Sequence, residues 1–285
     1  MCPVWAQDAM SAPRASVVIP AHDEEGCIEQ TLRTLLADAE PGEFQVVVVC
    51  NGCADGTADE ARQVPGVEVV EIPDASKITA LNEGDRRTDH FPRIYLDGDV
   101  RLSTHAARAL TAELKDDDAL AAGVSADYDL SRSSLGVRLF YGFRQELTVF
   151  SEGFIGAGVY ALSAAGRRRF EAWPDILGDD QFVYRLFAPH ERRTVPGHRT
   201  RVVAPEDLRT VVRRGVRVRR GNAQLTVGSS DRPALPPPPA GVKHVLRRSV
   251  RTPKGFASAV TFLAVTVLIR LIARFGHTGD WRTRA

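Results

Sequence analysis

The first 115 residues alternate between short apolar runs and segments whose apolar residues recur at helical spacing. Continuous apolar runs suit strands that are buried on both faces, as in a parallel sheet covered by helices. Strands are predicted on this basis at 15–20, 44–50, 67–72 and 93–96. The segments with helical spacing lie at 24–39, 54–64, 77–87 and 103–114. The alternation predicts an α/β protein with a doubly wound, mostly parallel central sheet and right-handed crossovers.

The pattern becomes less regular after residue 120. Residues 119–130 are expected to form a strand that leaves the sheet, and residues 134–150 an amphipathic helix. A glycine-rich turn, a short strand and the start of a helix are expected within 152–170. Farther along the chain, the acidic pair Asp179 and Asp180 directly precedes an apolar run with helical spacing.

Changes in composition divide the chain into four parts. Residues 1–14 are predicted to be an N-terminal tail, and residues 15–228 a globular domain. The proline-rich stretch 229–241, SSDRPALPPPPAG, is typical of a linker. Residues 242–285 are predicted to be a basic and apolar tail with helical character.

The tail combines a basic stretch at 243–254 with an apolar stretch at 256–275. About 14 uncharged residues precede Arg270, fewer than the roughly 20 that a membrane-spanning helix needs. Together the two stretches suit an anionic membrane surface, which would give a peripheral membrane contact through 242–275. A helix that docks back on the preceding domain fits the same pattern equally well, and both interpretations stay open here.

Composition and charge narrow the partners and the location. The net charge of +1 gives no overall argument for binding nucleic acid, so no nucleic-acid partner is expected. The N-terminus lacks a basic start followed by an apolar run, so no secretory signal is expected. The four unevenly spaced cysteines do not indicate a disulfide framework. A reduced, cytoplasmic location is therefore expected, at the inner face of the membrane if the tail binds lipid.

Candidate chemistry lies where the strands end, because ligands of doubly wound sheets bind outside the carboxyl ends of the strands. The four strand exits read PAHDEE, CNGCADGT, PDASK and DGDV. In the last exit, Asp97 and Asp99 flank Gly98 and would repel each other unless a cation lies between them. Carboxylate oxygens suit Mg²⁺ or Mn²⁺ together with substrate phosphates. The alternative is a plain turn, because Asp-Gly is a common turn dipeptide.

The strand exits, taken in order, resemble a known family. The segments VVIPAHDEE, VVVVCNGCADGTAD, KITALNEG and YLDGDV, followed later by GDDQF, resemble the family 2 inverting glycosyltransferases, which have the GT-A fold. The resemblance covers roughly residues 15–225. It implies that 15–228 is a catalytic domain that moves a sugar from a nucleotide-sugar donor to an acceptor hydroxyl. The transfer would proceed with inversion, by a single displacement.

The resemblance assigns the nucleotide to the first strand exits. The implied nucleotide-binding residues are Pro20, Ala21, Asp23, Glu24, Asn51, Asp55, Lys77 and Asp97. Two of them depart from the family pattern, since Asp23 stands where Asn is usual and Asn51 stands where Asp is common. Both can still hydrogen-bond a base or a ribose. The departures leave the nucleotide open, so UDP-, GDP- and dTDP-sugars are all candidate donors.

The resemblance also implies a metal site and a catalytic base. Asp99 is the expected direct ligand of Mg²⁺ or Mn²⁺, with Asp97 nearer the ribose or a metal-bound water. The metal would neutralise the leaving nucleoside diphosphate. Asp180 is the expected base that takes the proton of the acceptor hydroxyl, with Asp179 positioning the acceptor. The alternative for this pair is a helix N-cap.

Two further groups complete the candidate site. Gly156 and Gly158 resemble the family's glycine-rich segment near the donor sugar and the acceptor, although a tight turn would also explain them. Arginines lie where many relatives carry a basic helix or loop over the donor diphosphate, although a solvated basic face is the alternative. These arginines are Arg214, Arg217 and Arg220.

The resemblance narrows the acceptor only in part. The Gln-x-x-Arg-Trp motif of processive synthases is absent, which favours transfer of a single sugar. A glycan, a lipid-linked or a small-molecule acceptor fits, in the synthesis of cell-envelope polysaccharide or glycolipid.

Other functional classes remain as alternatives. Cys50 and Cys53 form a CxxC after a strand and before a helix, which is the setting of a thiol-redox motif. A nucleotidyltransferase shares the sheet architecture, but no glycine-rich triphosphate loop lies near the N-terminus. A non-catalytic module that binds a nucleotide-sugar is the third alternative, because a fold alone does not give function.

Overall fold

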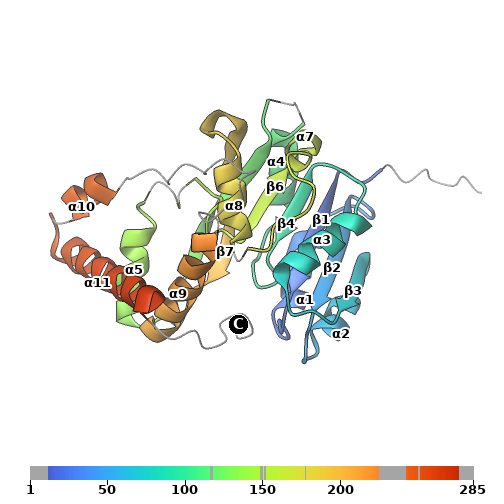
Figure 1. The fold of residues 1–285 in the computed structure, drawn as a ribbon. Helices are drawn as coiled ribbons and strands as arrows, with labels where there is room; N and C mark the ends of the chain where they lie inside the picture. The colour runs from blue at the N-terminus through green and yellow to red at the C-terminus, as the bar shows by residue number, and fades with distance from the viewer. Residues whose placement is uncertain are drawn as a thin grey trace, which may run out of the picture.

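The computed structural model describes residues 12–115, 118–147, 150, 152–176, 178–224, 242–249 and 251–275. This part of the chain is built around one sheet with seven strands (Figure 1). The strands are β1 (Ala15–Ala21), β2 (Phe44–Asn51), β3 (Val67–Ile72), β4 (Arg93–Leu96), β5 (Ala121–Asp129), β6 (Val159–Leu162) and β7 (Arg192–Val203). Their order is β3-β2-β1-β4-β6-β5-β7, and only β6 runs antiparallel to its neighbours. The expected mostly parallel α/β sheet is confirmed.

Helices cover both faces of the sheet. They are α1 (Ile28–Leu36), α2 (Thr57–Arg62), α3 (Lys77–Arg87), α4 (Thr104–Glu113), α5 (Leu135–Arg144), α7 (Ala164–Arg167), α8 (Asp179–Leu186), α9 (Leu208–Gln224), α10 (Val242–Ser249) and α11 (Pro253–Phe275), with a short 3-10 turn at Pro189–Glu191. Helices α1, α2 and α4 pack on one face through a core of fully buried aliphatic side chains. Helices α3 and α8 cover the other face, where aromatic residues fill the core.

The strand order creates the crevice in which a ligand of such a sheet binds. The chain builds β1, β2 and β3 outward in one direction, and then returns to place β4 on the other side of β1. The connections that leave β1 and β4 therefore diverge at this reversal, and the carboxyl ends of these strands open onto a crevice. The loops after β1, β2 and β4 carry the predicted site residues.

Three elements differ from the sequence-based expectation. The helix expected at 24–39 begins only at Ile28, because Asp23 and Gly26 have φ values of 53° and 83°, outside the helical region. Strand β5 does not leave the sheet but lies between β6 and β7. Strand β7 was not expected, because its sequence RRTVPGHRTRVV is basic and has no apolar run. It is an edge strand that pairs with β5 along its length and with Arg101 by a single bridge, and most of its side chains are exposed or half-buried.

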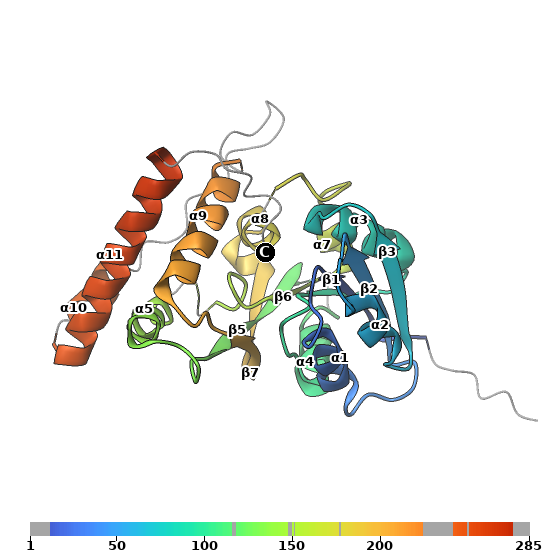
Figure 2. The ribbon, with the colours of Figure 1, turned by 90° about the horizontal axis from the view of Figure 1, so that it is seen from below.

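The tail folds onto the domain through α11. This helix lies alongside α5 and α9 (Figure 2), and Phe262 stacks on Phe140 at 5.3 Å between ring centroids. The docked interpretation therefore holds for one face of the helix. Helix α11 has 23 residues and is long and apolar enough, by length and composition, to cross a membrane. The expectation of a shorter apolar segment is wrong because the helix continues through Arg270. The predicted linker 229–241 and residues 1–11 of the predicted N-terminal tail lie outside the described residues.

Candidate active site

The loops after β1 and β2 are tied together by backbone and side-chain hydrogen bonds. The N–H of Glu24 donates to Thr57 Oγ1 at 2.8 Å, and the N–H of Glu25 donates to Asp55 Oδ2 at 3.0 Å. Asp23 accepts from the N–H of Ala54 at 2.8 Å. Asp55 is therefore occupied in bracing the two loops, and its pKa is lowered, since hydrogen bonds from Thr57 and the N–H of Glu25 outweigh the effect of burial.

The ends of β1 and β2 are held in register by Asn51. Its side-chain amide is buried and donates to the carbonyl oxygen of Ala21 at 2.8 Å. The Nδ1 atom of His22 lies 2.6 Å from the carbonyl oxygen of Asn51 and donates to it, because a carbonyl oxygen only accepts. Pro20 and Ala21 are buried inside β1, and both lie close to the exit of β4, since a Cβ on Gly98 would lie 3.4 Å from Ala21 Cβ and 3.5 Å from the carbonyl oxygen of Pro20.

Lys77 joins the two acidic motifs. It begins α3, whose first turn is capped by the Ser76 hydroxyl, which accepts from the N–H of Thr79 at 3.2 Å. Its Nζ lies 2.6 Å from Asp97 Oδ1 and 2.8 Å from Asp179 Oδ1. Burial opposes the charge of Lys77, but the two carboxylates raise its pKa above the ordinary value, so the ammonium stays charged. Residues that lie far apart in the sequence thus meet at one cation.

Three carboxylates crowd at the exit of β4. Glu24 packs so closely that a Cβ on Gly98 would lie 3.2 Å from its Cγ. Burial and the charges of Asp99 and Asp97 raise the pKa of Glu24 to about 8. Burial, together with Asp179 and Asp99, also raises the pKa of Asp97 to about 6 against the opposing effect of Lys77. Carboxylate oxygens are of the type that Mg²⁺ or Mn²⁺ prefers. Among the described residues, however, the oxygens of Glu24, Asp97 and Asp99 do not all lie within 4.8 Å of one another.

The second acidic pair begins helix α8. Asp179 is buried and accepts from Tyr160 Oη at 2.8 Å, in addition to its ion pair with Lys77. Asp180 accepts from the N–H of Gly156 at 3.0 Å and of Gln181 at 2.6 Å. Burial and the neighbouring charge of Asp179 raise the pKa of Asp180. The N-cap position belongs to Gly178, so the pair lies inside the first turn and does not cap it.

The glycine-rich segment brings the backbone close to both acidic motifs. Gly156 and Gly158 have φ values of 72° and 65°, which favour glycine. The carbonyl oxygen of Gly158 accepts from the N–H of Asp97 at 2.9 Å. A Cβ on Gly158 would lie 2.4 Å from Val100 Cγ2 and 3.3 Å from Asp97 Oδ2. The two predicted glycines are therefore in contact with the acidic cluster.

We expect Gly158→Ala to destabilise the protein by about 1–3 kcal/mol more than Gly26→Ala does. Both glycines have positive φ, but a Cβ on Gly26 would meet nothing within 4 Å, so Gly26→Ala isolates the backbone cost. The added clash with Val100 falls only on Gly158. Urea unfolding of the two variants measures the difference, and equal stabilities would contradict the close approach.

The arginines of α9 divide between two surfaces. The charge of Arg214 acts on Glu24, and that of Arg217 interacts with Asp97 and Asp99. Arg220 instead donates to the carbonyl oxygen of Ile272 in α11 at 3.4 Å. Each step of three residues falls about 60° short of a helical turn, so Arg220 lies on a different side of α9 from Arg214. Its place beside the donor diphosphate stays a prediction.

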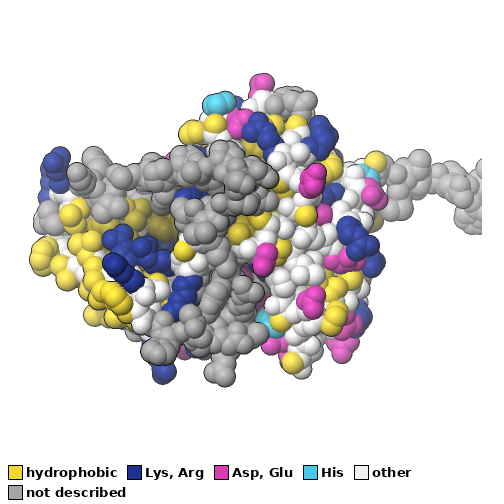
Figure 3. Space-filling model, in the orientation of Figure 1, with side chains coloured by type: hydrophobic (Ala, Val, Ile, Leu, Met, Phe, Trp, Pro, Cys, Tyr) yellow, Lys and Arg dark blue, Asp and Glu magenta, His cyan; other side chains and the backbone are white. Residues whose placement is uncertain are grey.

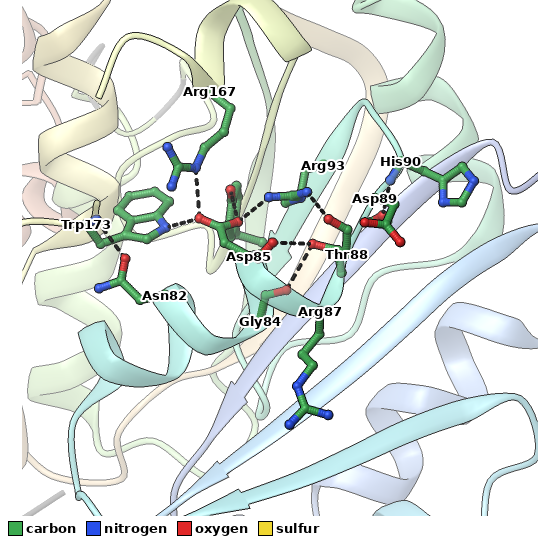
Figure 4. A network of polar contacts seen from close by, with 12 residues as sticks. Asn82, Gly84, Asp85, Arg87, Thr88, Asp89, His90, Arg93, Arg167 and Trp173 are labelled. Atoms are coloured by element: carbon green, nitrogen blue, oxygen red, sulfur yellow. Dashed lines mark hydrogen bonds and ion pairs between the residues drawn. The ribbon is translucent and has the colours of Figure 1, made fainter. Parts of the chain in front are cut away.

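A buried network of hydrogen bonds and ion pairs around Asp85, which the sequence analysis missed, lies next to this site (Figure 4). The carboxylate of Asp85, with 7% of its side chain exposed, accepts four hydrogen bonds. The donors are Arg93 Nη1 at 2.7 Å, Tyr95 Oη at 2.7 Å, Arg167 Nε at 2.8 Å and Trp173 Nε1 at 2.9 Å. Asn82, one turn earlier in α3, accepts from the N–H of Trp173 at 2.9 Å. The network fastens α3 to the segment that leads into α8.

The CxxC motif does not have the features of a reactive thiol pair. Cys50 is buried in the core, and this burial, with the neighbouring Cys53, raises its pKa to about 12. A reactive cysteine needs a lowered pKa, because the thiolate is the nucleophile. The structure therefore argues against the thiol-redox alternative.

Comparison with known proteins agrees with this geometry. The family model of glycosyl transferase family 2 matches residues 16–171, more than half of the chain. Probable glycosyltransferase YdaM of Bacillus subtilis (strain 168) is 32% identical over 91 residues, which cover 29% of this chain and only 22% of that relative's length.

Solved structures resemble the fold over most of the chain. The mannosyltransferase PcManGT from Pyrobaculum calidifontis, in complex with GDP-Man and Mn²⁺, has a TM-score of 0.57 at 20% identity, over 94% of this chain and 77% of its own. Glucosyl-3-phosphoglycerate synthase from Mycobacterium tuberculosis, in complex with Mn²⁺, UDP and glucosyl-3-phosphoglycerate, has a TM-score of 0.53 at 20% identity, over 76% and 81%. The chain belongs to glycosyl transferase family 2 and has the GT-A fold.

Proposed function

We propose that the protein is a divalent-metal-dependent, inverting glycosyltransferase that uses a nucleotide-sugar donor and transfers one sugar at a time. The observation that carries the proposal is the convergence of Asp97 and Asp179 on Lys77 at the carboxyl ends of the strands. This contact brings the proposed metal motif and the proposed base motif into one crevice. Mn²⁺ with GDP-Man or UDP in the two solved structures supports the same chemistry.

The donor is bound by groups of both charges. Asp99, assisted by Asp97 and Glu24, would hold Mg²⁺ or Mn²⁺, whose positive charge would stabilise the leaving diphosphate. Arg214 and Arg217 approach the same carboxylates from α9 and contribute positive charge beside the diphosphate. The loops after β1 and β2 bind the nucleobase and the ribose of the donor. UDP-, GDP- and dTDP-sugars all remain candidate donors.

Asp180 acts as the general base. Asp179 is already engaged by Lys77 and Tyr160, whereas Asp180 is held by two backbone N–H groups that fix its carboxylate without neutralising it. The acceptor hydroxyl attacks the anomeric carbon from the face opposite the diphosphate. As the new C–O bond forms and the bond to the diphosphate breaks, Asp180 takes the hydroxyl proton. Attack from the opposite face inverts the anomeric centre.

The activity should depend on pH through this base. Because the pKa of Asp180 is raised, a larger share of the enzyme holds it protonated, and therefore inactive as a base, at mildly acidic pH. We expect the transfer rate at saturating donor to fall as the pH decreases, with a midpoint above the ordinary aspartate pKa of about 4. A pH profile of the maximal rate measures this midpoint. A rate that stays constant down to that pH would contradict the assignment.

The test of the proposed function is nucleoside diphosphate release from UDP-, GDP- and dTDP-sugars, with Mn²⁺ and with a chelator. We expect release from one donor class, lost with the chelator. Nucleotide binding without release from any donor, across a panel of glycan, lipid-linked and small-molecule acceptors, would favour the non-catalytic module instead.

We further propose that the catalytic domain comprises residues 15–228 and works in the cytoplasm. The face of α11 that points away from α5 and α9 would contact the inner face of the membrane. The acceptor would belong to cell-envelope polysaccharide or glycolipid synthesis.

A further inference from the structure

Helix α11 has an apolar face that nothing in the described part of the chain covers. Ser258, Ala259 and Val265 are buried against the domain. The opposite face exposes between 38% and 70% of each large apolar side chain. These side chains are Phe256, Val260, Leu263, Val267, Leu268, Leu271, Ile272 and Phe275. Most of them recur every three or four residues, so they form one continuous stripe along the helix.

A cavity of about 810 Å³ lies beside this stripe, between α5, α9 and α11. Apolar side chains such as Phe140, Phe150 and Ile269 line much of it. The charged residues of its lining are all arginines: Arg144, Arg219, Arg220, Arg270 and Arg274. Figure 3 shows dark-blue side chains set among yellow ones over this part of the molecule. The chemistry of the cavity is thus apolar and strongly cationic.

The cationic groups include three without a carboxylate partner among the described residues. Arg219, Arg270 and Arg274 form no ion pair with any aspartate or glutamate of the described ranges. Arginine forks beside an apolar cavity match an amphiphile that joins a phosphate to a hydrocarbon chain. A volume of this size falls in the range of ligand-binding pockets.

The cavity connects to the proposed base through a short chain of hydrogen bonds. Arg144 lies over the ring of Phe150 at 3.9 Å and donates to Tyr128 Oη at 2.7 Å. Tyr128 donates to the carbonyl oxygen of Gly156 at 2.7 Å, and the N–H of Gly156 donates to Asp180 at 3.0 Å. The side chains of Arg144 and Tyr128 and the backbone of Gly156 therefore lie between a ligand in the cavity and Asp180.

We propose that this cavity binds a phosphate-bearing membrane lipid whose head group carries the acceptor hydroxyl. The apolar walls hold the start of the hydrocarbon chain, and the arginines hold the phosphate. The exposed stripe of α11 lies in the membrane surface from which the lipid enters. This inference rests on the proposed function, since it names the acceptor class for the same base. The head group extends past Arg144 and Tyr128 to bring its hydroxyl to Asp180. The hydroxyl oxygen then forms the new C–O bond, the bond to the nucleoside diphosphate breaks, and Asp180 takes the hydroxyl proton.

Point substitutions test this better than truncation, because removing α11 would expose Phe140 and Phe143, on which Phe262 packs. The full chain is floated with vesicles of phosphatidylcholine alone or mixed equally with phosphatidylglycerol. Phosphatidylglycerol supplies both the phosphate charge and free hydroxyls. We expect binding to the mixed vesicles only, and no competition by soluble glycerol phosphate.

Two double variants test separately the arginines of the cavity and the apolar stripe of α11. We expect the double change Arg219→Glu and Arg270→Glu to weaken vesicle binding by at least about tenfold, since each basic residue near an anionic surface contributes about 1 kcal/mol. We expect Leu263→Glu with Val267→Glu to weaken it similarly. Arg168→Glu is the matched control, because Arg168 is exposed and does not line the cavity.

Four outcomes would overturn the inference. They are absence of vesicle binding, binding that the arginine variant does not change, competition by glycerol phosphate that equals the lipid, and self-association through the stripe. Donor binding with Mn²⁺, measured on the same preparations, separates the two proposals. If it persists while vesicle binding fails, only the lipid inference falls. If donor binding also fails, the proposed function falls with it.

Discussion

Replacing Asp180 by Asn should lower the rate of sugar transfer by about a hundredfold to ten-thousandfold, the range that a general base contributes. The amide has nearly the same shape and can still accept the hydrogen bond from the N–H of Gly156, so the local structure should persist. It cannot take the proton of the acceptor hydroxyl. Binding of nucleotide with Mn²⁺ should therefore remain close to that of the unsubstituted protein.

The control for this prediction is Asp175→Asn. Asp175 is exposed and lies in the same segment, only five positions before Asp180, so it tests the same chemical change outside the crevice. Its transfer rate should stay unchanged. Steady-state kinetics of both variants test whether Asp180 is the general base. An Asp180→Asn variant that transfers sugar at the normal rate would remove Asp180 from the mechanism and return the role of base to Asp179.

Replacing Asp85 by Asn should lower the free energy of unfolding by about 3–5 kcal/mol, the cost of removing one partner from a buried ion pair. Arg93 and Arg167 would both lose their negative partner in a region where the side chain of Arg93 is only 5% exposed. Because Trp173 also bonds to Asp85, the segment before α8 would lose an anchor. Sugar transfer should fall as well, since α8 begins with the acidic pair.

Asp59→Asn is the matched control for stability. Asp59 also pairs with an arginine, Arg62, but 84% of its side chain is exposed, so its loss should cost at most about 1 kcal/mol. Urea unfolding compares the two variants under the same conditions. If both substitutions cost the same small amount, Asp85 does not hold this part of the fold together.

The elements that could be predicted are those whose structure depends on nearby residues in the sequence. Helix α3 occupies the expected residues 77–87, because Ser76 caps it and its apolar residues follow helical spacing. Strands β1 and β2 are mainly apolar because they are buried almost throughout. Strand β7 could not be predicted, because its alternation of arginine and other residues suits an exposed edge and resembles a basic loop.

The sequence could indicate which residues belong to the candidate site, but not which of them contact one another. The ordered motifs indicate Asp97, Asp99 and the pair at 179–180, whereas the ion pairs through Lys77 depend on the tertiary fold. Asp85 was missed because the sequence EGDRR reads as an ordinary charged helix surface. Its burial arises only when Arg167 and Trp173 return to α3 from a distant segment. The contact of Arg220 with Ile272 could not be predicted, because sequence spacing alone does not show which face of α9 meets α11.

The most direct test of the metal-dependent nucleotide site is titration calorimetry of UDP, GDP and dTDP, each with and without Mn²⁺. The proteins to compare are the unsubstituted chain, Asp99→Ala and the control Asp127→Ala, whose carboxylate is exposed on β5. We predict that one nucleotide binds only with Mn²⁺, that Asp99→Ala abolishes this binding, and that Asp127→Ala leaves it intact. Binding that is independent of Mn²⁺ and unchanged in Asp99→Ala would contradict the account.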